Sequence, residues 1–214
     1  MIKKITTITL LLGTFHYSFS QINKNDSTEK LYVRFNFLGL LDLSDENLSI
    51  GMEYRFRPKW STGSDIAWIF NSSYLSTQSN SANGFMVRPF IRYYPSKNKN
   101  RFFEAELYYK FVSYKIQDWL GHDPVNGIPS YEEFTTFHYN KNVLDIHIKR
   151  GTQLSLTKDH RLRMEFIYGL GLRWKWQRVK NGIYNLSGYL GTIYDPEVKT
   201  LVIPATIRLL YKIK

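Results

Sequence analysis

Ser113 and His138 are the two side chains in this sequence that could carry out nucleophilic chemistry together. A serine hydroxyl becomes a nucleophile when a neighbouring histidine accepts its proton, and an enzyme that cleaves lipid esters requires this chemistry. Ser113 and His138 lie in different stretches of the chain, and no spacing rule fixes the distance between their side chains. A lipid-modifying enzyme therefore stays open as an alternative, but the sequence assigns no catalytic residue.

The other candidate ligands are scattered histidines and a group of acidic residues. The histidines are His122, His138, His147 and His160, and the acids are Asp118, Asp123, Glu132 and Glu133. Neither set has the spacing of a recognised metal site, so structural roles are expected for them. The acids could collect a divalent cation, but a solvated loop accounts for them more simply. With no phosphate-binding glycine loop or triad signature either, we predict no catalytic, cofactor or metal site.

A larger set of charged residues carries both signs and recurs at alternate positions of apolar-rich stretches. The acidic members are Glu53, Glu104, Glu106, Asp145 and Glu165, and the basic members are Arg55, Arg88, Arg92, Lys149, Arg163 and Arg173. Alternate positions of a β-strand share one face, because successive side chains point to opposite sides. Unpaired charges would be costly in a narrow enclosed space, so the mixture of signs predicts a paired and filled interior.

The stretch 161–177 has the clearest alternation. One set of alternate positions, from Leu162 to Trp176, is wholly apolar or aromatic. The other set is mostly charged or polar, and only Ile167 and two glycines interrupt it. A period of two predicts a β-strand. A strand of this length with one wholly apolar face needs an apolar medium on that side, which is either a protein core or lipid.

Eight strands of this kind are predicted along the chain. Their bounds are residues 30–41, 48–57, 64–74, 85–94, 101–116, 137–156, 161–177 and 200–213, and the long loops are residues 72–84, 118–131 and 178–197. The connections after the second, fourth and sixth strands are short. An even strand number with short turns on one side and longer loops on the other is typical of outer-membrane barrels. The sequence therefore predicts an all-β fold, an eight-stranded antiparallel up-and-down transmembrane β-barrel with both termini periplasmic.

A soluble barrel of lipocalin type has the same alternation, but its apolar face points inward around a ligand. The aromatic residues favour the membrane form, because they gather near the strand ends. Trp60 and Tyr93 lie near short turns, and Trp68, Trp174 and Trp176 lie near long loops. These positions match the two aromatic girdles of membrane barrels. A soluble periplasmic barrel that binds a small apolar ligand is kept as an alternative.

The first residues of the chain predict export. Two lysines precede the apolar run 5–12, and Ser18 and Ser20 then offer the small residues that a signal peptidase reads. The predicted organisation is a signal peptide at residues 1–20, a flexible segment at residues 21–29 and an outer-membrane β-barrel at residues 30–214. Cleavage removes two lysines and no acid, which lowers the formal net charge from +11 to +9. For an exported basic chain, lipid phosphates and lipopolysaccharide are better partners than nucleic acid, but solvated turn lysines and paired interior arginines account for the charge more simply than either. The absence of cysteine excludes disulfides and thiolate sites.

Three segments carry a resemblance to a known class of proteins. They read Asn47-Leu48-Ser49-Ile50-Gly51-Met52-Glu53-Tyr54-Arg55, Arg88-Pro89-Phe90-Ile91-Arg92-Tyr93-Tyr94 and Tyr168-Gly169-Leu170-Gly171-Leu172-Arg173. Together they resemble small, uncharacterised outer-membrane β-barrel proteins of Gram-negative bacteria. The resemblance implies a porin-like, eight-stranded architecture of OmpA/OmpX type, assembled by the barrel assembly machinery, and it implies no activity. One departure is the final Lys214, since such barrels commonly end on an aromatic residue that this machinery reads.

These patterns together predict a non-enzymatic outer-membrane protein. Its expected role is structural, or an interaction at the cell surface through the extracellular loops. The expected partners are outer-membrane lipid, lipopolysaccharide and the assembly machinery, and the sequence specifies no other ligand.

Overall fold

The structure is a computed structural model. It describes residues 30–41, 45–72, 79–95, 100–123, 125–126, 128–179 and 197–213. The predicted signal peptide and flexible segment, at residues 1–29, and most of the predicted loop at 178–197 lie outside the described residues.

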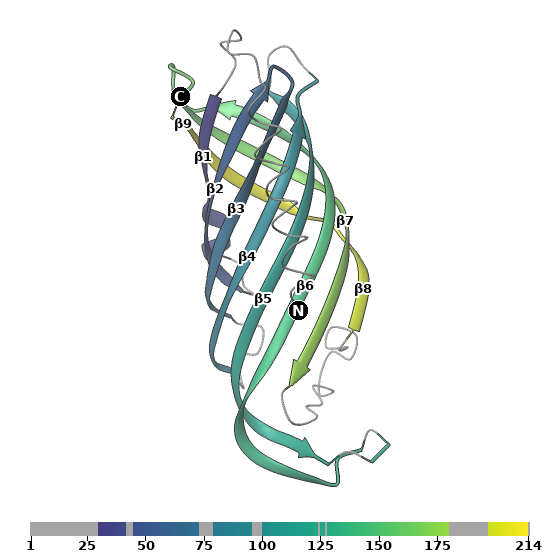
Figure 1. The fold of residues 1–214 in the computed structure, drawn as a ribbon. Helices are drawn as coiled ribbons and strands as arrows, with labels where there is room; N and C mark the ends of the chain where they lie inside the picture. The colour runs from purple at the N-terminus through teal and green to yellow at the C-terminus, as the bar shows by residue number, and fades with distance from the viewer. Residues whose placement is uncertain are drawn as a thin grey trace, which may run out of the picture.

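The described residues form one antiparallel sheet of nine strands, with one short 3-10 helix. The elements are β1 (Lys30–Asn36), η1 (Phe37–Leu41), β2 (Glu46–Arg57), β3 (Trp60–Asn71), β4 (Ser79–Tyr93), β5 (Arg101–His122), β6 (Tyr131–Ser155), β7 (Leu162–Val179), β8 (Glu197–Val202) and β9 (Ala205–Lys212). Each strand from β1 to β7 pairs with the next, and β9 pairs with both β7 and β1. A ring of eight strands is thereby closed (Figure 1). The all-β class and the eight-membered antiparallel ring are confirmed.

The ring has two distinct ends. At one end lie the Pro58–Lys59 turn, the start of β1 and the end of β9, and we call it the short-turn end. At the opposite end the β5–β6 hairpin runs well past the other strands (Figure 1), and we call it the long-loop end. Among the described residues, β4 pairs with β5 only up to Ile116, and β7 pairs with β6 only from Tyr139 onward. The tip of this hairpin, within the described residues, is therefore a two-stranded projection.

The prediction that the eighth strand is continuous is wrong. Residues 200–213 are divided between β8 and β9, and the break falls at Ile203 and Pro204. Both pieces pair with β7. Proline has no N–H to donate to a ladder, which explains the interruption. The carbonyl of Pro204 still accepts a hydrogen bond from the Gly169 amide at 2.9 Å.

Two predicted loops are wrong in their length, because strands occupy part of them. β4 begins at Ser79, β5 extends to His122, and β6 begins at Tyr131. In β4, Ala82 is buried while the polar residues Ser81 and Asn83 on either side are exposed. Serine and asparagine were interpreted as loop residues, but here they form the water-facing side of a strand. The first predicted strand is shorter than expected, because the chain enters η1 after Asn36.

The inward and outward faces of the strands agree with the predicted alternation. On β7, Glu165 and Ile167 are buried, whereas Phe166 and Leu170 are 42% and 58% exposed. The glycines of this strand lie on the inner face, where space is limited. A Cβ added to Gly171 would lie 2.2 Å from Cδ2 of His147. Glycine therefore makes room for the larger side chains of the neighbouring strand, as predicted.

Candidate functional site

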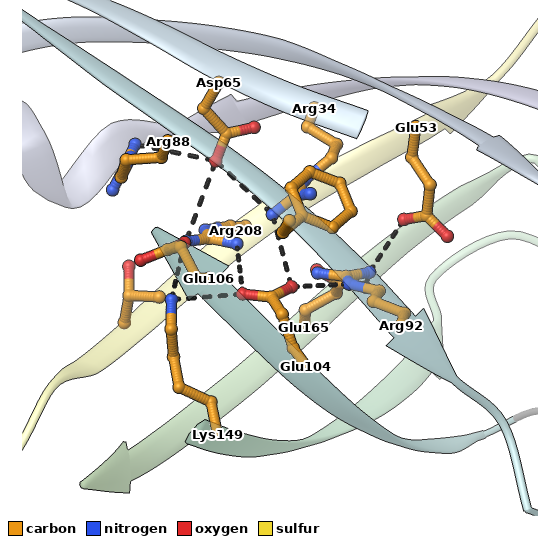
Figure 2. Close-up of polar contacts among 12 residues, drawn as sticks. Arg34, Glu53, Asp65, Arg88, Arg92, Glu104, Glu106, Lys149, Glu165 and Arg208 are labelled. Atoms are coloured by element: carbon orange, nitrogen blue, oxygen red, sulfur yellow. Dashed lines mark hydrogen bonds and ion pairs between the residues drawn. The ribbon is translucent and has the colours of Figure 1, made fainter. Parts of the chain in front are cut away.

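The inside of the ring is filled with charged side chains, which we call the charged interior. Its buried members are Arg34, Glu53, Arg55, Asp65, Arg88, Arg92, Glu104, Glu106, Asp145, His147, Lys149, Glu165 and Arg208. They come from β1 to β7 and from β9, so every strand of the ring contributes (Figure 2). The predicted mixture of signs on the inner face is confirmed. Ion pairs that cross the ring join these side chains to one another.

Arg92 on β4 is the centre of one part of this network. It is fully buried and contacts three carboxylates from three other strands. Its Nε donates to Glu104 Oε2 at 2.5 Å, and its Nη1 donates to Glu53 Oε2 at 2.7 Å. Nη1 and Nη2 also donate to the two oxygens of Glu165, at 2.6 and 2.8 Å. Bidentate pairing of this kind is the strongest arginine–carboxylate geometry, and it ties β4 to β2, β5 and β7.

A second part of the network surrounds Asp65 on β3. Three arginines approach its Oδ2, with Arg34 at 3.3 Å and Arg88 and Arg208 both at 3.7 Å. Arg208 also lies 3.4 Å from Glu106. Figure 2 shows how these groups link to the Arg92 cluster across the ring. The contacts join β1, β3, β4, β5 and β9, so they stabilise the closure of the ring as well as its filling.

His147 takes the structural role that the sequence predicted for it. Its Nδ1 lies 3.1 Å from Glu106, and its Nε2 lies 3.3 Å from Asp145. Asp145 in turn accepts from Arg173 Nη2 at 2.7 Å. One of the two carboxylates that contact the imidazole, that of Asp145, is therefore also paired with Arg173, near the long-loop side of the charged interior.

Asp45, just before β2, forms a separate node. Its carboxylate accepts hydrogen bonds from Lys110 Nζ at 2.6 Å and Lys141 Nζ at 2.9 Å. It also accepts from the hydroxyls of Tyr114 and Ser72, both at 2.8 Å. Burial alone would raise the pKa of Asp45, but the two ammonium groups reverse this and hold the pKa below its ordinary value. The Asp45 carboxylate therefore stays ionised, and the node forms the long-loop boundary of the charged interior.

The polarity of the inner face reverses beyond the Asp45 node. Toward the long-loop end the interior is apolar, and we call this cluster the loop-side core. Its members are Ile69, Ala82, Val112, Tyr114, Ile116, Leu120, Phe137 and Tyr139. At the base of this core, the Tyr139 hydroxyl donates to Gln177 at 2.6 Å.

The outer face of the ring reverses in the opposite sense. Alongside the charged interior it is apolar, and we call this surface the apolar belt. Exposed members of the belt include Leu48, Ile50, Met52, Ile66, Trp68, Phe85, Ile91, Phe103, Leu107, Ile146, Ile148, Phe166, Tyr168, Leu170, Leu172 and Leu201. On β5 the outward side chains change from Leu107 and Phe111 to Ser113, Lys115 and Gln117. Inside and outside therefore exchange polarity at the same height of the ring.

The projecting tip of the β5–β6 hairpin carries exposed apolar side chains. Trp119 and Phe134 are paired across the ladder, with ring centroids 5.6 Å apart, and each is more than half exposed. Val125 and Ile128 are 65% and 71% exposed at the turn. Asn126 has a φ of 54°, a left-handed conformation that asparagine tolerates better than most residues. The described residues of the tip thus present an apolar surface to solvent.

Ser113 and His138 are brought together by the pairing of β5 and β6. The Ser113 hydroxyl oxygen lies 3.4 Å from His138 Nδ1, on the outer face just beyond the apolar belt. They line an open hollow of about 500 Å³ that also includes Phe85, Phe111 and Lys115. Among the described residues, no carboxylate contacts His138, so the pair lacks the third group that orients the base in a catalytic triad.

The other candidate ligands are dispersed. His122 stacks on Tyr131, with centroids 5.1 Å apart, and its Nε2 lies 3.5 Å from Glu133. His160 Nδ1 lies 2.9 Å from the Ser155 hydroxyl in the β6–β7 turn. Asp118 accepts from the Trp119 amide at 2.8 Å. Within the described part of the chain, no group of three or more potential ligands could hold a metal ion.

Several members of the network were not anticipated as site residues. Arg34 and Arg208 lie on inner faces that the alternation does define, so the same pattern could have identified them. Lys110 lies on the inner face of β5, which the same alternation defines, but nothing in the sequence marks its partner. Asp45 lies between elements, where no periodicity applies, and only the three-dimensional arrangement reveals its four donors.

Comparison with protein-family models, with curated proteins and with solved structures found no match to this chain. None of the helical residues that the structure describes belongs to a helix long and apolar enough to cross a membrane.

Proposed function

We propose that this protein is a small outer-membrane β-barrel, non-enzymatic, with a structural or surface-interaction role through its long-loop end. The observation that carries the proposal is the double reversal of polarity along β5 and β6. Beside the charged interior, the outside is apolar; beside the loop-side core, the outward residues of β5 from Ser113 to Gln117 and of β6 from Thr136 to Asn140 are polar, and apolar side chains return only at the projecting tip. A protein surrounded by water throughout has no reason to change its outer surface at one height. A lipid layer around only that part of the barrel supplies the reason.

The energetic balance of the interior supports the same proposal. Eight buried cations and seven buried carboxylates are found among the described residues. Near-balanced charges in contact are what a narrow, sealed barrel requires. A soluble barrel of lipocalin type would need the opposite arrangement, with apolar side chains around a ligand and polar ones in water. An eight-stranded interior is about filled by side chains, so a conducting pore is not proposed.

The surface-interaction role is proposed for the tip of the β5–β6 hairpin. In the proposed orientation the short-turn end is periplasmic and the hairpin projects outward from the cell. Exposed Trp119 and Phe134 on a narrow projection give a rigid aromatic contact surface with little entropy to lose on binding. Val125 and Ile128 extend that surface to the tip. The partner is not defined by this surface.

The location can be tested with single cysteines, because the chain has none of its own. Leu107→Cys and Gln117→Cys both place the thiol on the outward face of β5, ten residues apart along the strand. In intact cells, a membrane-impermeant maleimide is expected to label Gln117→Cys and to leave Leu107→Cys unlabelled. A lipid-soluble maleimide is expected to label Leu107→Cys. The labelled fraction is read by mass spectrometry of the purified protein.

The soluble alternative gives a different result in the same experiment. If neither cysteine reacts with the impermeant reagent in intact cells, both react after the cells are broken, and the protein is recovered in the soluble periplasm, the membrane proposal is wrong. Unheated and heated samples in detergent give a second readout, since a folded membrane barrel migrates differently before heating. Unchanged mobility together with equal labelling would favour the ligand-binding soluble barrel.

A second candidate function is favoured by the contact between Ser113 and His138. In the proposed orientation this pair lies at the outer membrane boundary, where it could hydrolyse an acyl ester of an outer-leaflet lipid. The serine oxygen would bond to the ester carbonyl carbon as its proton passes to His138, and the lipid alcohol would leave with that proton as its own bond to the carbonyl carbon breaks. Water would then hydrolyse the acyl-serine ester and release the fatty acid. Against this function, the contact is long at 3.4 Å and no described carboxylate orients the histidine.

Fatty-acid release from reconstituted vesicles separates the two functions. If the protein is non-enzymatic, the wild type, Ser113→Ala and His138→Ala are expected to release equal, background amounts of fatty acid. Loss of general-base assistance typically costs about 10²–10⁴-fold in rate. A drop of that size in both variants, with unchanged heat-dependent mobility, would establish the hydrolase instead.

A further inference from the structure

An open groove of about 810 Å³ crosses β6, β7 and β8 on the outer side of the ring, at the long-loop edge of the apolar belt. Its apolar lining is formed by two aliphatic side chains and two tryptophans: Leu144, Ile146, Trp174 and Trp176. Three basic residues complete it: Lys175, Arg178 and Lys199. None of the described residues that line the groove is acidic. The groove therefore combines an apolar floor with positive charge.

The strand register arranges these residues in layers. Ile146, Leu172 and Leu201 form one row across the three strands, and every member is aliphatic. The next outward-facing row toward the long-loop end is Leu144, Trp174 and Lys199. Arg178 lies four residues farther along β7 than Trp174 and is exposed. Along the direction from belt to loops, the surface thus changes from aliphatic to aromatic, with Lys199 and Arg178 at the loop edge. One acidic position, Glu197, is paired with Trp176 between them.

We propose that this groove binds a phosphorylated, multiply acylated glycolipid of the outer leaflet, of the lipopolysaccharide class. The inference rests on the proposed membrane location, since it requires the aliphatic row to lie in lipid. Acyl chains lie against Leu144 and Ile146, and the ammonium of Lys199 and guanidinium of Arg178 bind phosphate oxygens. The indole rings occupy the interface between the two regions, where tryptophan is favoured because it has an apolar body and one N–H donor.

The charge pattern distinguishes this ligand from simpler ones. A free phosphate would use the basic residues and leave the aliphatic lining without a role. A zwitterionic phospholipid carries an ammonium group, which the outward-facing Lys199 and Arg178 would repel. A glycolipid with several phosphates and no cationic group complements both parts of the groove. Each basic side chain near an anionic lipid surface contributes about a fivefold gain in affinity.

The test uses the full-length protein reconstituted in phosphatidylcholine vesicles that contain purified bisphosphorylated lipid A, with bound lipid measured by native mass spectrometry after detergent release. The variant Arg178→Gln/Lys199→Gln removes two of the basic groups and is expected to reduce lipid A binding about tenfold or more. The matched control is Arg57→Gln/Lys59→Gln, which removes two exposed basic residues at the short-turn end. The control is expected to bind as the wild type does. Two competitors, inorganic phosphate and dephosphorylated lipid A, are expected to leave wild-type binding unchanged.

Each other outcome overturns the proposal. Equal binding by the wild type and Arg178→Gln/Lys199→Gln would exclude the groove as the site. An equal loss in the Arg57→Gln/Lys59→Gln control would mean that net charge alone attracts the lipid. Competition by inorganic phosphate would reduce the site to an anion site. Failure of the protein to fold into vesicles, judged by heat-dependent mobility, would reject the membrane proposal itself; folding without selective lipid A binding would reject only the groove.

Discussion

Replacing Leu170 with arginine is expected to lower the free energy of unfolding of the barrel in a bilayer by about 2–4 kcal/mol. Leu170 is 58% exposed on the outward face of β7, where it pairs with Ile148, itself 62% exposed. In the proposed orientation both side chains face lipid well inside the apolar belt. An arginine there must take its guanidinium into hydrocarbon or distort the bilayer to reach water.

In water the same substitution would leave the free energy of unfolding almost unchanged. An exposed leucine on a soluble protein can be replaced by a charged residue at a cost within about 0.5 kcal/mol, because the new side chain is fully hydrated. Leu170→Arg therefore separates a membrane barrel from a soluble one without any assumption about a ligand. Urea titration of protein folded into phospholipid vesicles, followed by tryptophan fluorescence, gives the free energy directly.

Gln117→Arg is the matched control for this prediction. Gln117 is exposed on the outward face of β5, but it lies beyond the belt on the projecting hairpin. The substitution adds the same charged group at a site that the proposal places in water, so no measurable change in stability is expected. If Leu170→Arg were as silent as Gln117→Arg, the apolar belt would not face lipid.

The sequence predicts the two faces of most strands because alternation is a local property. Tyr32 and Arg34 are buried on β1, and Ile66 and Trp68 are exposed on β3, as their positions in the pattern require. The strand ends were harder to predict, since the polarity reversal is invisible to a pattern that assumes one apolar face throughout. Ser81 and Asn83 resemble loop residues because they lie on the exposed, outward face of β4, in a part of the strand that extends beyond the apolar belt.

The partners within the charged interior could not be predicted. Arg92 contacts Glu53 and Glu165, which are 39 and 73 residues away in sequence, and only closure of the ring makes them neighbours. Asp45 is a second case, because it belongs to no strand and has no periodicity to mark it. The charged character of the inner face could therefore be predicted from the sequence. The ion pairs between its side chains could not, because they depend on the strand register and on the pairing of β9 with β1.

Removal of the Arg92 side-chain charge is expected to destabilise the protein more than any other single change in the interior. Arg92→Met keeps much of the volume but leaves Glu53, Glu104 and Glu165 around a site with no central cation. Breaking one partner from a buried ion pair typically costs about 3–5 kcal/mol, because the remaining charge stays buried without compensation. Here three carboxylates lose the same donor. Reduced folding yield and a lower urea midpoint in vesicles are the expected measurements.

Two further variants show whether the loss comes from charge. Arg57→Met removes an exposed arginine at the short-turn end and is expected to leave stability unchanged. Arg92→Met/Glu165→Gln also removes one of the carboxylates that Arg92→Met leaves without its cation. The double variant is expected to be more stable than Arg92→Met alone. Glu165 is the partner of choice, because it accepts from both Nη1 and Nη2 of Arg92. In a dry, filled interior the two substitutions must therefore be strongly non-additive. Strict additivity, or an Arg92→Met variant no weaker than Arg57→Met, would mean that water screens these charges and that the barrel is not sealed by its ion pairs.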